Sequence, residues 1–403
     1  MTAPRNRAAV TLKKPLERAI RQGHPWVFRD ALAQPPTLPD GALVLVRGRD
    51  RRPLALGFWD ATSAIAVRLI TDDLERSPAA IVDDRLRGAL ASRLAQLSRD
   101  ETNAFRWVHG EADRLPGIHV DLYDDVAAVR YDGAGARAFY GALADRLAAA
   151  ARPLALHAVI DREGRRVMAG APVADREVRE NGLRFGVDLL AGQKGGLFLD
   201  QRENRQAIRE RAAGRSVLNL FGYTGGFSVY AAAGGARRTD TVDSARPALA
   251  SARRNFERNG LPLEQAGLHG EDAFAFLTAA AARGQSWDIV ISDPPSFAPR
   301  KDALPAARNA YLRLHRLGIA VTAPGGLFCP ASCSSHFPPD EFLASVERAA
   351  AATGRRFTLE MLRGAGRDHP VLPAFPEGDY LKFAIGRIDR IDRVAPPRPA
   401  RPL

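Results

Sequence analysis

The sequence predicts an α/β protein whose C-terminal half forms a doubly wound, mostly parallel sheet. From Ser216 onward, short apolar strands alternate strictly with helical segments, as far as "LFCPASCSS". A glycine-rich turn follows the first of these strands, and a later strand ends on an acid and two prolines, Asp293-Pro294-Pro295. Such alternation is typical of parallel sheets that bind ligands at the carboxyl ends of their strands.

The overall composition indicates several domains and a polyanionic partner. A chain of 403 residues exceeds the usual size of a single core, so two or three domains are expected. Its net charge of +12 suits nucleic acid, because neutralised phosphates release counterions. An arginine-rich proteome is the alternative explanation. No apolar run spans a bilayer and no secretory signal follows the basic N-terminus, so we expect a cytoplasmic protein with no membrane partner.

The cysteine pattern excludes a disulfide framework. The chain has two cysteines, Cys329 and Cys333, and both lie in one short segment. No set of Cys and His has the spacing of a zinc site, so no metal is expected.

Residues 1–74 are expected to form a small β-rich domain. Short strand-like runs cover residues 41–50, 54–60 and 64–71. Before them, "RQGHPWVFRD" places Trp26 and Phe28 among basic residues, where rings can stack on bases. The alternative is that both rings fill a small barrel core.

Residues 75–187 read as an α+β middle domain. Helical spacing covers residues 81–97 and 136–150, with strand-like runs between and after them. No catalytic motif is present in this region, which could serve as a spacer, a homodimer surface or part of an RNA platform.

The third region, residues 188–403, contains the candidate ligand site. Gly222 and Gly225 lie between a strand and a helix, where glycine lets the backbone approach a ligand. The spacing is not that of a dinucleotide turn, and no lysine follows as in a P-loop. Taken alone, the turn also fits a tight connection.

Two acids follow this turn in the order that an S-adenosylmethionine site needs. Asp243 ends the next strand, where a carboxylate can accept hydrogen bonds from ribose hydroxyls. Asp240 is a poorer candidate because it lies within the strand. Asp272 stands at a helix start after the following strand, so it is both a candidate N-cap and a candidate partner of the adenine amino group.

The motifs resemble a known family. "SDPPSF" is similar to the fourth motif of class I methyltransferases that act on nucleobases. Together with "GGLFLDQRENR", "NLFGYTGGFSVYA", "SCSSH" and "DHPVLPAFPEGDYLK", it resembles the bacterial large-subunit rRNA methyltransferases that form 5-methylcytosine. The resemblance covers nearly the whole chain. It implies a PUA-like RNA-binding domain, an α+β middle domain and a Rossmann-like catalytic domain for the three regions.

The resemblance also implies roles for individual residues. A site for S-adenosyl-L-methionine would comprise Gln201, Arg202, Phe221, Gly222, Tyr223, Gly225, Asp243, Asp272 and Asp293. An arginine suits the carboxylate of the methionine moiety, although from the residues alone Arg202 is a surface charge on its helix. On the substrate side, Trp26 would contact the RNA.

The Asp-Pro-Pro segment would receive the target base. Pro294 and Pro295 form a rigid elbow without N–H donors, which leaves the Pro294 carbonyl exposed to an amino group of a flipped base. Phe297 would offer a ring face. The alternative is a strand terminated by proline without further function.

Cys333 matches the catalytic cysteine of the family. A thiolate that adds to carbon 6 of cytosine activates carbon 5 towards methylation. His336 is a candidate aid to ionisation, and Cys329 is expected in the core. Many RNA cytosine-5 methyltransferases place a second cysteine after the Asp-Pro, but this chain and the resembled family do not. The acceptor of the carbon-5 proton is therefore open between Asp293 and a bound water.

Two other functions remain open at this stage. The enzyme could methylate another atom, such as guanine N7, in which case Cys333 would be dispensable. The chain could also be a non-catalytic PUA-containing ribosome-assembly factor. The expected partner is 23S rRNA, either naked or in a large-subunit assembly intermediate.

Overall fold

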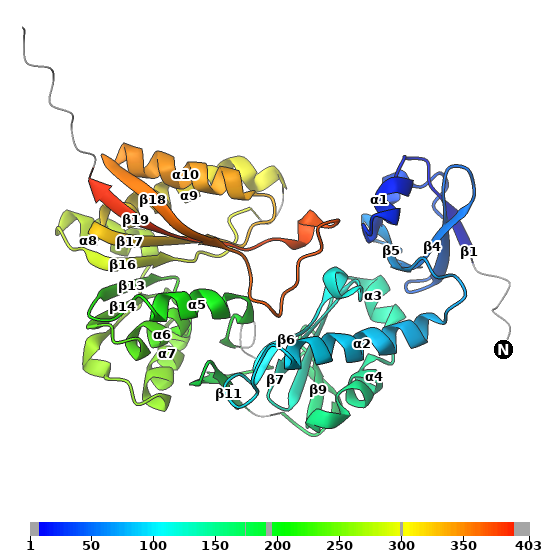
Figure 1. The fold of residues 1–403 in the computed structure, drawn as a ribbon, viewed down its shortest axis with the longest axis horizontal. Helices are drawn as coiled ribbons and strands as arrows, with labels where there is room; N and C mark the ends of the chain where they lie inside the picture. The colour runs from blue at the N-terminus through cyan, green and yellow to red at the C-terminus, as the bar shows by residue number, and fades with distance from the viewer. Residues whose placement is uncertain (1–7, 174, 191–195, 299–300, 391–403) are drawn as a thin grey trace, which may run out of the picture. The chain divides into compact units, whose positions relative to one another are not determined.

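The computed structural model describes residues 8–173, 175–190, 196–298 and 301–390. Its contacts divide the chain into two compact units (Figure 1). The first unit comprises Met1–Glu203 and Ala365–Asp379, and the second comprises Asn204–Gly364 and Tyr380–Leu403. The Pro/Arg-rich tail, for which the sequence predicts fraying, lies outside the described residues, as does Gly195 of the quoted "GGLFLDQRENR" motif. The two boundaries expected between the three domains stay predictions.

The first unit begins with a five-stranded sheet in the order β1-β3-β4-β5-β2. Its strands are β1 Ala8–Thr11, β2 Trp26–Phe28, β3 Leu43–Arg47, β4 Pro53–Trp59 and β5 Ile65–Thr71, with helix α1 at Glu17–Arg21. The three predicted strands are therefore present as β3, β4 and β5. Buried branched side chains such as Val27, Val44 and Val67 form the core of this sheet.

A second five-stranded sheet, ordered β10-β9-β8-β7-β6, forms the middle of this unit. Its strands are β6 Ala104–His109, β7 Ile118–Tyr123, β8 Val126–Tyr131, β9 Ala158–Asp161 and β10 Arg166–Gly170. The helices are α2 Pro78–Leu94, α3 Ala134–Phe139 and α4 Leu143–Ala150. A separate hairpin pairs β11 Arg176–Glu180 with β12 Leu183–Val187, and its turn residues Asn181 and Gly182 both have positive φ.

The single helix predicted over residues 136–150 is wrong, because the structure has two helices there. The break falls at Tyr140, whose ψ of 29° leaves the helical range. The Tyr140 ring packs edge-on against Phe58 of β4 and against Phe139. Aromatic packing on the first sheet, followed by Gly141, outweighs the helix propensity of this alanine-rich stretch.

The second unit is built on a seven-stranded sheet in the order β15-β14-β13-β16-β17-β19-β18. Its strands are β13 Ser216–Leu220, β14 Arg238–Val242, β15 Ala266–His269, β16 Trp287–Ser292, β17 Thr322–Ser332, β18 Arg355–Arg363 and β19 Lys382–Arg390. The helices are α6 Gly226–Ala233, α7 Arg246–Arg258, α8 Ala273–Ala282, α9 Leu304–Ala320 and α10 Pro339–Ala352, preceded by α5 Arg202–Arg209.

Strands β13 to β17 are parallel, and β19 is antiparallel to both of its neighbours. Leu220 at the end of β13 lies level with Val242 of β14 and with Ser292 of β16. Ser292 in turn pairs with Pro330 of β17. The carboxyl ends of these strands therefore share one edge of the sheet, where a parallel sheet binds its ligands.

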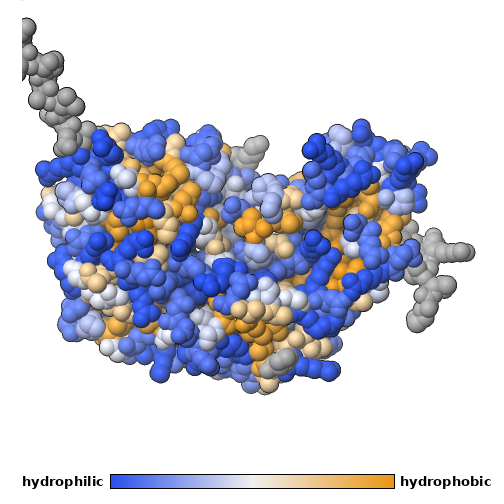
Figure 2. Space-filling view, in the orientation of Figure 1, coloured by the Kyte–Doolittle hydropathy of each residue, from blue (hydrophilic) through white to orange (hydrophobic). Residues whose placement is uncertain are grey.

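Hydrophilic residues cover most of the face shown in Figure 2. Among the described residues, no helix combines the length and the apolar character needed to cross a membrane.

Candidate cofactor and catalytic site

The turn after β13 has an unusual backbone. Phe221 and Tyr223 adopt positive φ values of 56° and 49°, and Gly225 has a φ of 77°. Positive φ is uncommon for residues other than glycine, and it clusters at ligand-binding turns. At Gly222 a Cβ atom would lie only 2.4 Å from the Thr241 methyl group, so glycine is required there for the turn to lie against β14.

Asp243 links this turn to the start of helix α7. Its Oδ2 accepts a hydrogen bond from the Tyr223 amide at 2.8 Å, and its Oδ1 accepts one from the Ala245 amide at 2.8 Å. The side chain is half-buried. A carboxylate has about four acceptor positions, so it retains capacity for two ligand hydroxyls.

Asp272 and Asp240 differ as the sequence predicts. Asp272 is exposed and caps α8, with Oδ1 accepting from the Ala275 amide at 3.0 Å. Asp240 is fully buried and bonded to His269 and to the Trp287 indole, each at 2.8 Å. Burial would raise the pKa of Asp240, but these hydrogen bonds and one from Arg238 outweigh it and lower the pKa. Asp240 is a structural acid.

The edge of the sheet fits S-adenosylmethionine in its chemistry. Beside the tight turn and the half-buried Asp243, the hydroxyl of Ser292 at the end of β16 is buried without a hydrogen-bond partner among the described residues. Asp293, the next residue, is half-buried. An orphan hydroxyl and two accessible carboxylates offer polar partners to a ligand that carries hydroxyl, amino and carboxylate groups.

Gln201 and Arg202 are both buried and belong to the first unit, whereas the other expected cofactor residues belong to the second. Arg202 donates to both carboxylate oxygens of Asp368, at 2.7 Å and 3.1 Å. Burial alone would lower the pKa of Arg202, but Asp368 reverses the shift and raises it. The alternative of a surface charge on the helix is therefore wrong.

Cys333 follows directly after β17 and is half-buried. Its neighbour Ser334 forms a hydrogen bond of 2.8 Å with Ser296, the residue after Asp293-Pro294-Pro295. The segment that carries the cysteine therefore lies against the Asp-Pro-Pro segment. Pro294 is buried in this elbow, and Pro295 is exposed.

Tyr311 of α9 contacts both the segment that carries Cys333 and the segment that follows Asp-Pro-Pro. Its hydroxyl bonds to Ser332 Oγ at 2.9 Å and to Ser334 Oγ at 3.3 Å. Its ring lies 4.9 Å from that of Phe297, the residue expected to offer a face to the base. Burial raises the pKa of Tyr311, so the phenol stays protonated. No sequence signal distinguished Tyr311 from the other apolar positions of its helix.

Lys382 is a second residue that the motif reading missed. It is buried at the start of β19, directly opposite Ser332 of β17. Its ammonium donates to the Ser334 carbonyl at 2.5 Å and to the Tyr380 carbonyl at 2.8 Å. A buried cation thus holds the residue after Cys333. The signal was present, because Lys382 ends the quoted motif "DHPVLPAFPEGDYLK".

The other two residues near the cysteine have simpler environments. Cys329 is fully buried within β17, and burial raises the pKa of its thiol, in agreement with the expected core role. His336 is exposed and forms no hydrogen bond with any described residue. No contact between described residues supports a role for His336 in ionising the Cys333 thiol.

The aromatic pair in the first sheet does not fill its core. Phe28 is 39% exposed, so the core-filling alternative is wrong for this ring. Trp26 is half-buried, its ring lies 4.5 Å from that of Phe375, and its indole N–H donates to Glu111 at 2.8 Å. Phe28 is therefore the more accessible of the two rings.

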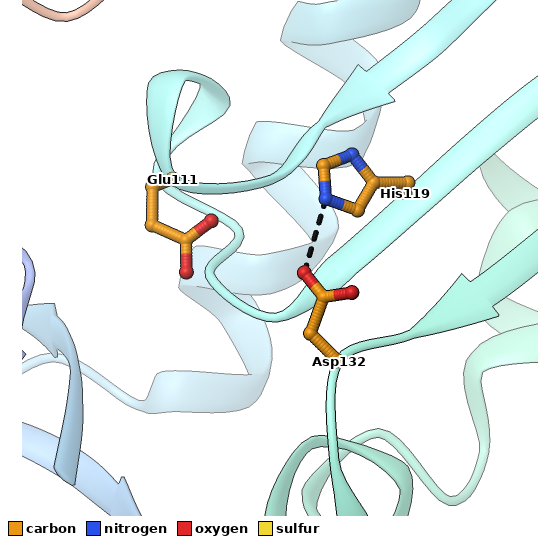
Figure 3. A group of neighbouring side chains, drawn as sticks. All are labelled: Glu111, His119 and Asp132. Carbon is orange, nitrogen blue, oxygen red and sulfur yellow. Dashed lines mark hydrogen bonds and ion pairs between the residues drawn. The ribbon is translucent and has the colours of Figure 1, made fainter. Parts of the chain in front are cut away.

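Glu111, His119 and Asp132 form the one group in the described chain with a spacing that metal ligands use (Figure 3). The partners of His119 argue against a metal. Arg106 lies 3.1 Å from Nδ1 and has no proton acceptor to offer, so Nδ1 must accept and Nε2 must carry the proton that goes to Asp132 at 3.1 Å. A protonated Nε2 is not a ligand. Burial, aided by Arg106, lowers the pKa of His119, which keeps the ring neutral.

Comparisons with known proteins agree with this geometry. The chain matches the family model of the S-adenosylmethionine-dependent methyltransferases over residues 144–371 and the model of the PUA-like domain over residues 10–72. The Ribosomal RNA large subunit methyltransferase I of Aeromonas salmonicida is 33% identical, over 94% of this chain and 98% of its own length. The protein of the same name from Photobacterium profundum is 35% identical, over 93% and 98%.

Solved structures share the fold. A putative SAM-dependent methyltransferase from Streptococcus mutans has a TM-score of 0.82 at 23% identity, covering 94% of this chain and 100% of the other. A putative methyltransferase complexed with SAH has the same TM-score at 24% identity, covering 94% and 99%.

The alternating, mostly parallel sheet is that of an α/β methyltransferase, and the predicted fold class is confirmed. The chain belongs to the family of S-adenosylmethionine-dependent methyltransferases, with a PUA-like domain near its N-terminus. Its cofactor is S-adenosylmethionine, as predicted.

Proposed function

We propose that this protein methylates carbon 5 of a cytosine in 23S ribosomal RNA, with Cys333 as the nucleophile. The observation that carries the proposal is the hydrogen bond between Ser296 and Ser334, which holds the cysteine segment against the Asp-Pro-Pro elbow. The names of the near-full-length relatives support a ribosomal RNA substrate. A net charge of +12 and the PUA-like domain are consistent with RNA binding.

In the proposed reaction the base is swung out of its helix beside the elbow. The Pro294 carbonyl accepts a hydrogen bond from its amino group, and the Phe297 ring lies against its face. Trp26 and the exposed ring of Phe28 in the PUA-like domain contact the surrounding RNA. The cofactor supplies an electrophilic methyl group on its sulfonium.

The Cys333 thiolate adds to carbon 6 and forms a carbon–sulfur bond, which moves the electron pair of the ring double bond onto carbon 5. Carbon 5 then accepts the methyl group. Loss of its proton restores the double bond and expels the thiolate. Asp293 and a bound water are the two candidate acceptors of this proton. Lys382 acts as a positioning residue, because a cation beside this segment favours the ionised thiol.

For the cofactor we assign the ribose hydroxyls to Asp243 and the adenine amino group to Asp272. Phe221, Gly222, Tyr223 and Gly225 would surround the methionine end, and Asp293 would border the methyl group. Gln201 and Arg202 stay proposed contacts. A ribosomal RNA substrate would place the reaction in the cytoplasm. A homodimer through the middle region is a further prediction, which sedimentation of the full chain would test.

The experiment compares the wild type, Cys333→Ala and Cys329→Ala on undermethylated 23S rRNA with labelled cofactor. We expect the wild type and Cys329→Ala to protect one cytosine from bisulfite conversion. Cys333→Ala should lose turnover by at least about a thousandfold while still binding the cofactor. RNA containing 5-fluorocytosine, which cannot lose its carbon-5 substituent as a proton, should form a denaturation-resistant adduct only when Cys333 is present.

Normal turnover by Cys333→Ala would remove the covalent mechanism and favour methylation of another base atom. Absence of cofactor binding by the wild type in calorimetry would instead support a non-catalytic role.

A further inference from the structure

A groove of about 550 Å³ runs along helix α2 in the first unit. Helix residues Arg85, Gly88 and Ser92 line one side of it. The other lining residues include Arg114, in the turn that follows β6, Arg76, which precedes the helix, and the three aspartates Asp73, Asp84 and Asp113. None of the residues discussed above as cofactor or base contacts lines this groove.

The positive charge in the groove exceeds what its acids neutralise. Asp84 is engaged by Arg76 and Arg87, and Asp113 is bonded to both terminal nitrogens of Arg93. The third acid, Asp73, accepts from the Glu75 and Arg76 amides. Arg85 and Arg114 have no acidic partner within 4 Å among the described residues.

Arg85 is held in place by the backbone. Its Nη1 donates to the Ile70 carbonyl at 2.6 Å and to the Arg114 carbonyl at 2.7 Å. Its other guanidinium nitrogens have no protein partner in the described chain. Burial, followed by the charge of Arg114, lowers the pKa of Arg85 to about 10. An arginine whose charge is this poorly compensated can bind an anion. A guanidinium group contacts two phosphate oxygens at once through two parallel N–H donors.

Two backbone features at the groove also need a reason. Gly88 lies inside a helix of 17 residues, where glycine is less favourable than alanine, yet a Cβ there would meet no atom within 4 Å. The protein itself does not require glycine at this position. Arg114 has a φ of 57°, a conformation that favours asparagine or glycine. Both choices are explained if a ligand passes close to Gly88 and meets the Arg114 side chain.

We propose that this groove binds a phosphodiester of the RNA substrate, with Arg85 and Arg114 on the phosphate and Gly88 providing clearance for the backbone of the nucleic acid. This inference rests on the proposed RNA methyltransferase function. It assigns to the middle region a role in holding RNA that is independent of sequence, because contacts to phosphates position a nucleic acid without reading its bases.

The test measures RNA binding by the full-length protein as a function of salt. The probes are a 23S rRNA fragment and an unrelated RNA of equal length, with inorganic phosphate as a competitor. Arg114→Asn removes one charge at a backbone conformation that asparagine tolerates, and Arg166→Asn, at the exposed first residue of β10, is its control. Gly88→Leu fills the groove with a better helix former, and Ala91→Leu, exposed on the same helix outside the groove, is its control.

We expect Arg114→Asn to weaken both RNAs about threefold to tenfold and to lower the slope of log K against log salt by about one. Gly88→Leu should raise the thermal midpoint while weakening both RNAs by a similar factor. Both controls should bind as the wild type does. Millimolar phosphate should compete less well against Arg114→Asn than against the wild type.

Unchanged affinity and slope in Arg114→Asn and Gly88→Leu, with normal RNA binding and methylation by the wild type, would overturn the groove assignment and leave the proposed function intact. Phosphate competition that disappears in Arg114→Asn without any change in RNA binding would also overturn it, because the groove would then hold only small anions. A wild type that binds no RNA would reject the proposed function itself.

Discussion

Ser296 and Ser334 are joined by a hydrogen bond of 2.8 Å between their hydroxyl oxygens, across two loops that follow neighbouring parallel strands. Ser334 also receives the Lys382 ammonium on its carbonyl and lies 3.3 Å from the Tyr311 hydroxyl. The position of Cys333 relative to the Asp-Pro-Pro elbow therefore depends on a small polar network and not on the strands alone. Disturbing this network tests whether the cysteine must be held in place.

Ser296→Ala and Ser334→Ala should each lower kcat on rRNA by about fivefold to tenfold, because a neutral hydrogen bond contributes about 1 kcal/mol. The double variant should lose little more than Ser334→Ala alone, because Ser296→Ala removes only the bond that the two serines share, whereas Ser334→Ala also removes the bond to Tyr311. Ser335→Ala, at the exposed neighbour, is the control. Single-turnover rates measure the effect. Fully additive losses would mean that the two serines act independently.

Lys382→Met should lower the rate at pH 7 by about tenfold and restore part of it at higher pH, where the thiol ionises without a nearby cation. It should also cost about 1 to 3 kcal/mol of stability, since the buried Ser334 carbonyl and the half-buried Tyr380 carbonyl lose this donor. The pH–rate profile separates the two effects. A loss that is equal at every pH would show that Lys382 only supports the fold.

Asp243→Ala should weaken S-adenosylhomocysteine binding by about tenfold to a hundredfold, the usual range for losing hydrogen bonds to a charged group. Asp288→Ala is the matched control, because this acid bonds Ser216 and Arg237 near the amino ends of β13 and β16 in the same sheet. Calorimetry measures both affinities. Equal losses in the two variants would point to a general effect on the sheet.

The alternation of strands and helices predicted β13 to β17 and the acids at their ends. Hydrophobic periodicity and prolines that end a strand are signals that a short stretch of sequence carries by itself. The hydrogen-bond network around Cys333 could not be predicted from local sequence signals. Tyr311 meets Ser332 only through the crossover between β16 and β17, and Lys382 reaches Ser334 only because β19 runs antiparallel beside β17. The break at Tyr140 depends on packing against Phe58, which lies on a different sheet. Contacts between distant segments decide each of these cases.

Arg202 and Asp368 illustrate the same point, since they are 166 residues apart and fully buried together. Arg202→Met should cost about 3 to 5 kcal/mol, because it removes the guanidinium from a buried carboxylate whose other partners are the Arg106 amide and His369. Arg202→Met with Asp368→Asn should recover part of this loss. Denaturant unfolding gives the stabilities, and calorimetry with the cofactor tests the proposed contact. If the double variant regains stability but not cofactor affinity, Arg202 has two roles: it pairs with Asp368 and it also contacts the cofactor.

His315 predicts a pH dependence of stability. It is buried between α9 and α10 with Ser345 as its hydrogen-bond partner, and burial lowers its pKa to about 3. The unfolded chain, with a pKa of about 6.5 for this group, therefore binds more protons than the folded one at intermediate pH. The stability that this neutral ring contributes is complete above about pH 6.5 and is lost as the pH falls, by about 2 kcal/mol at pH 5.

His315→Phe keeps an aromatic ring against Phe328 and Phe342 but cannot titrate. Between pH 7 and pH 5, the unfolding free energy of this variant should therefore fall about 2 kcal/mol less than that of the wild type. Urea unfolding at the two pH values measures the difference, and parallel losses in both proteins would mean that His315 is not a neutral core residue.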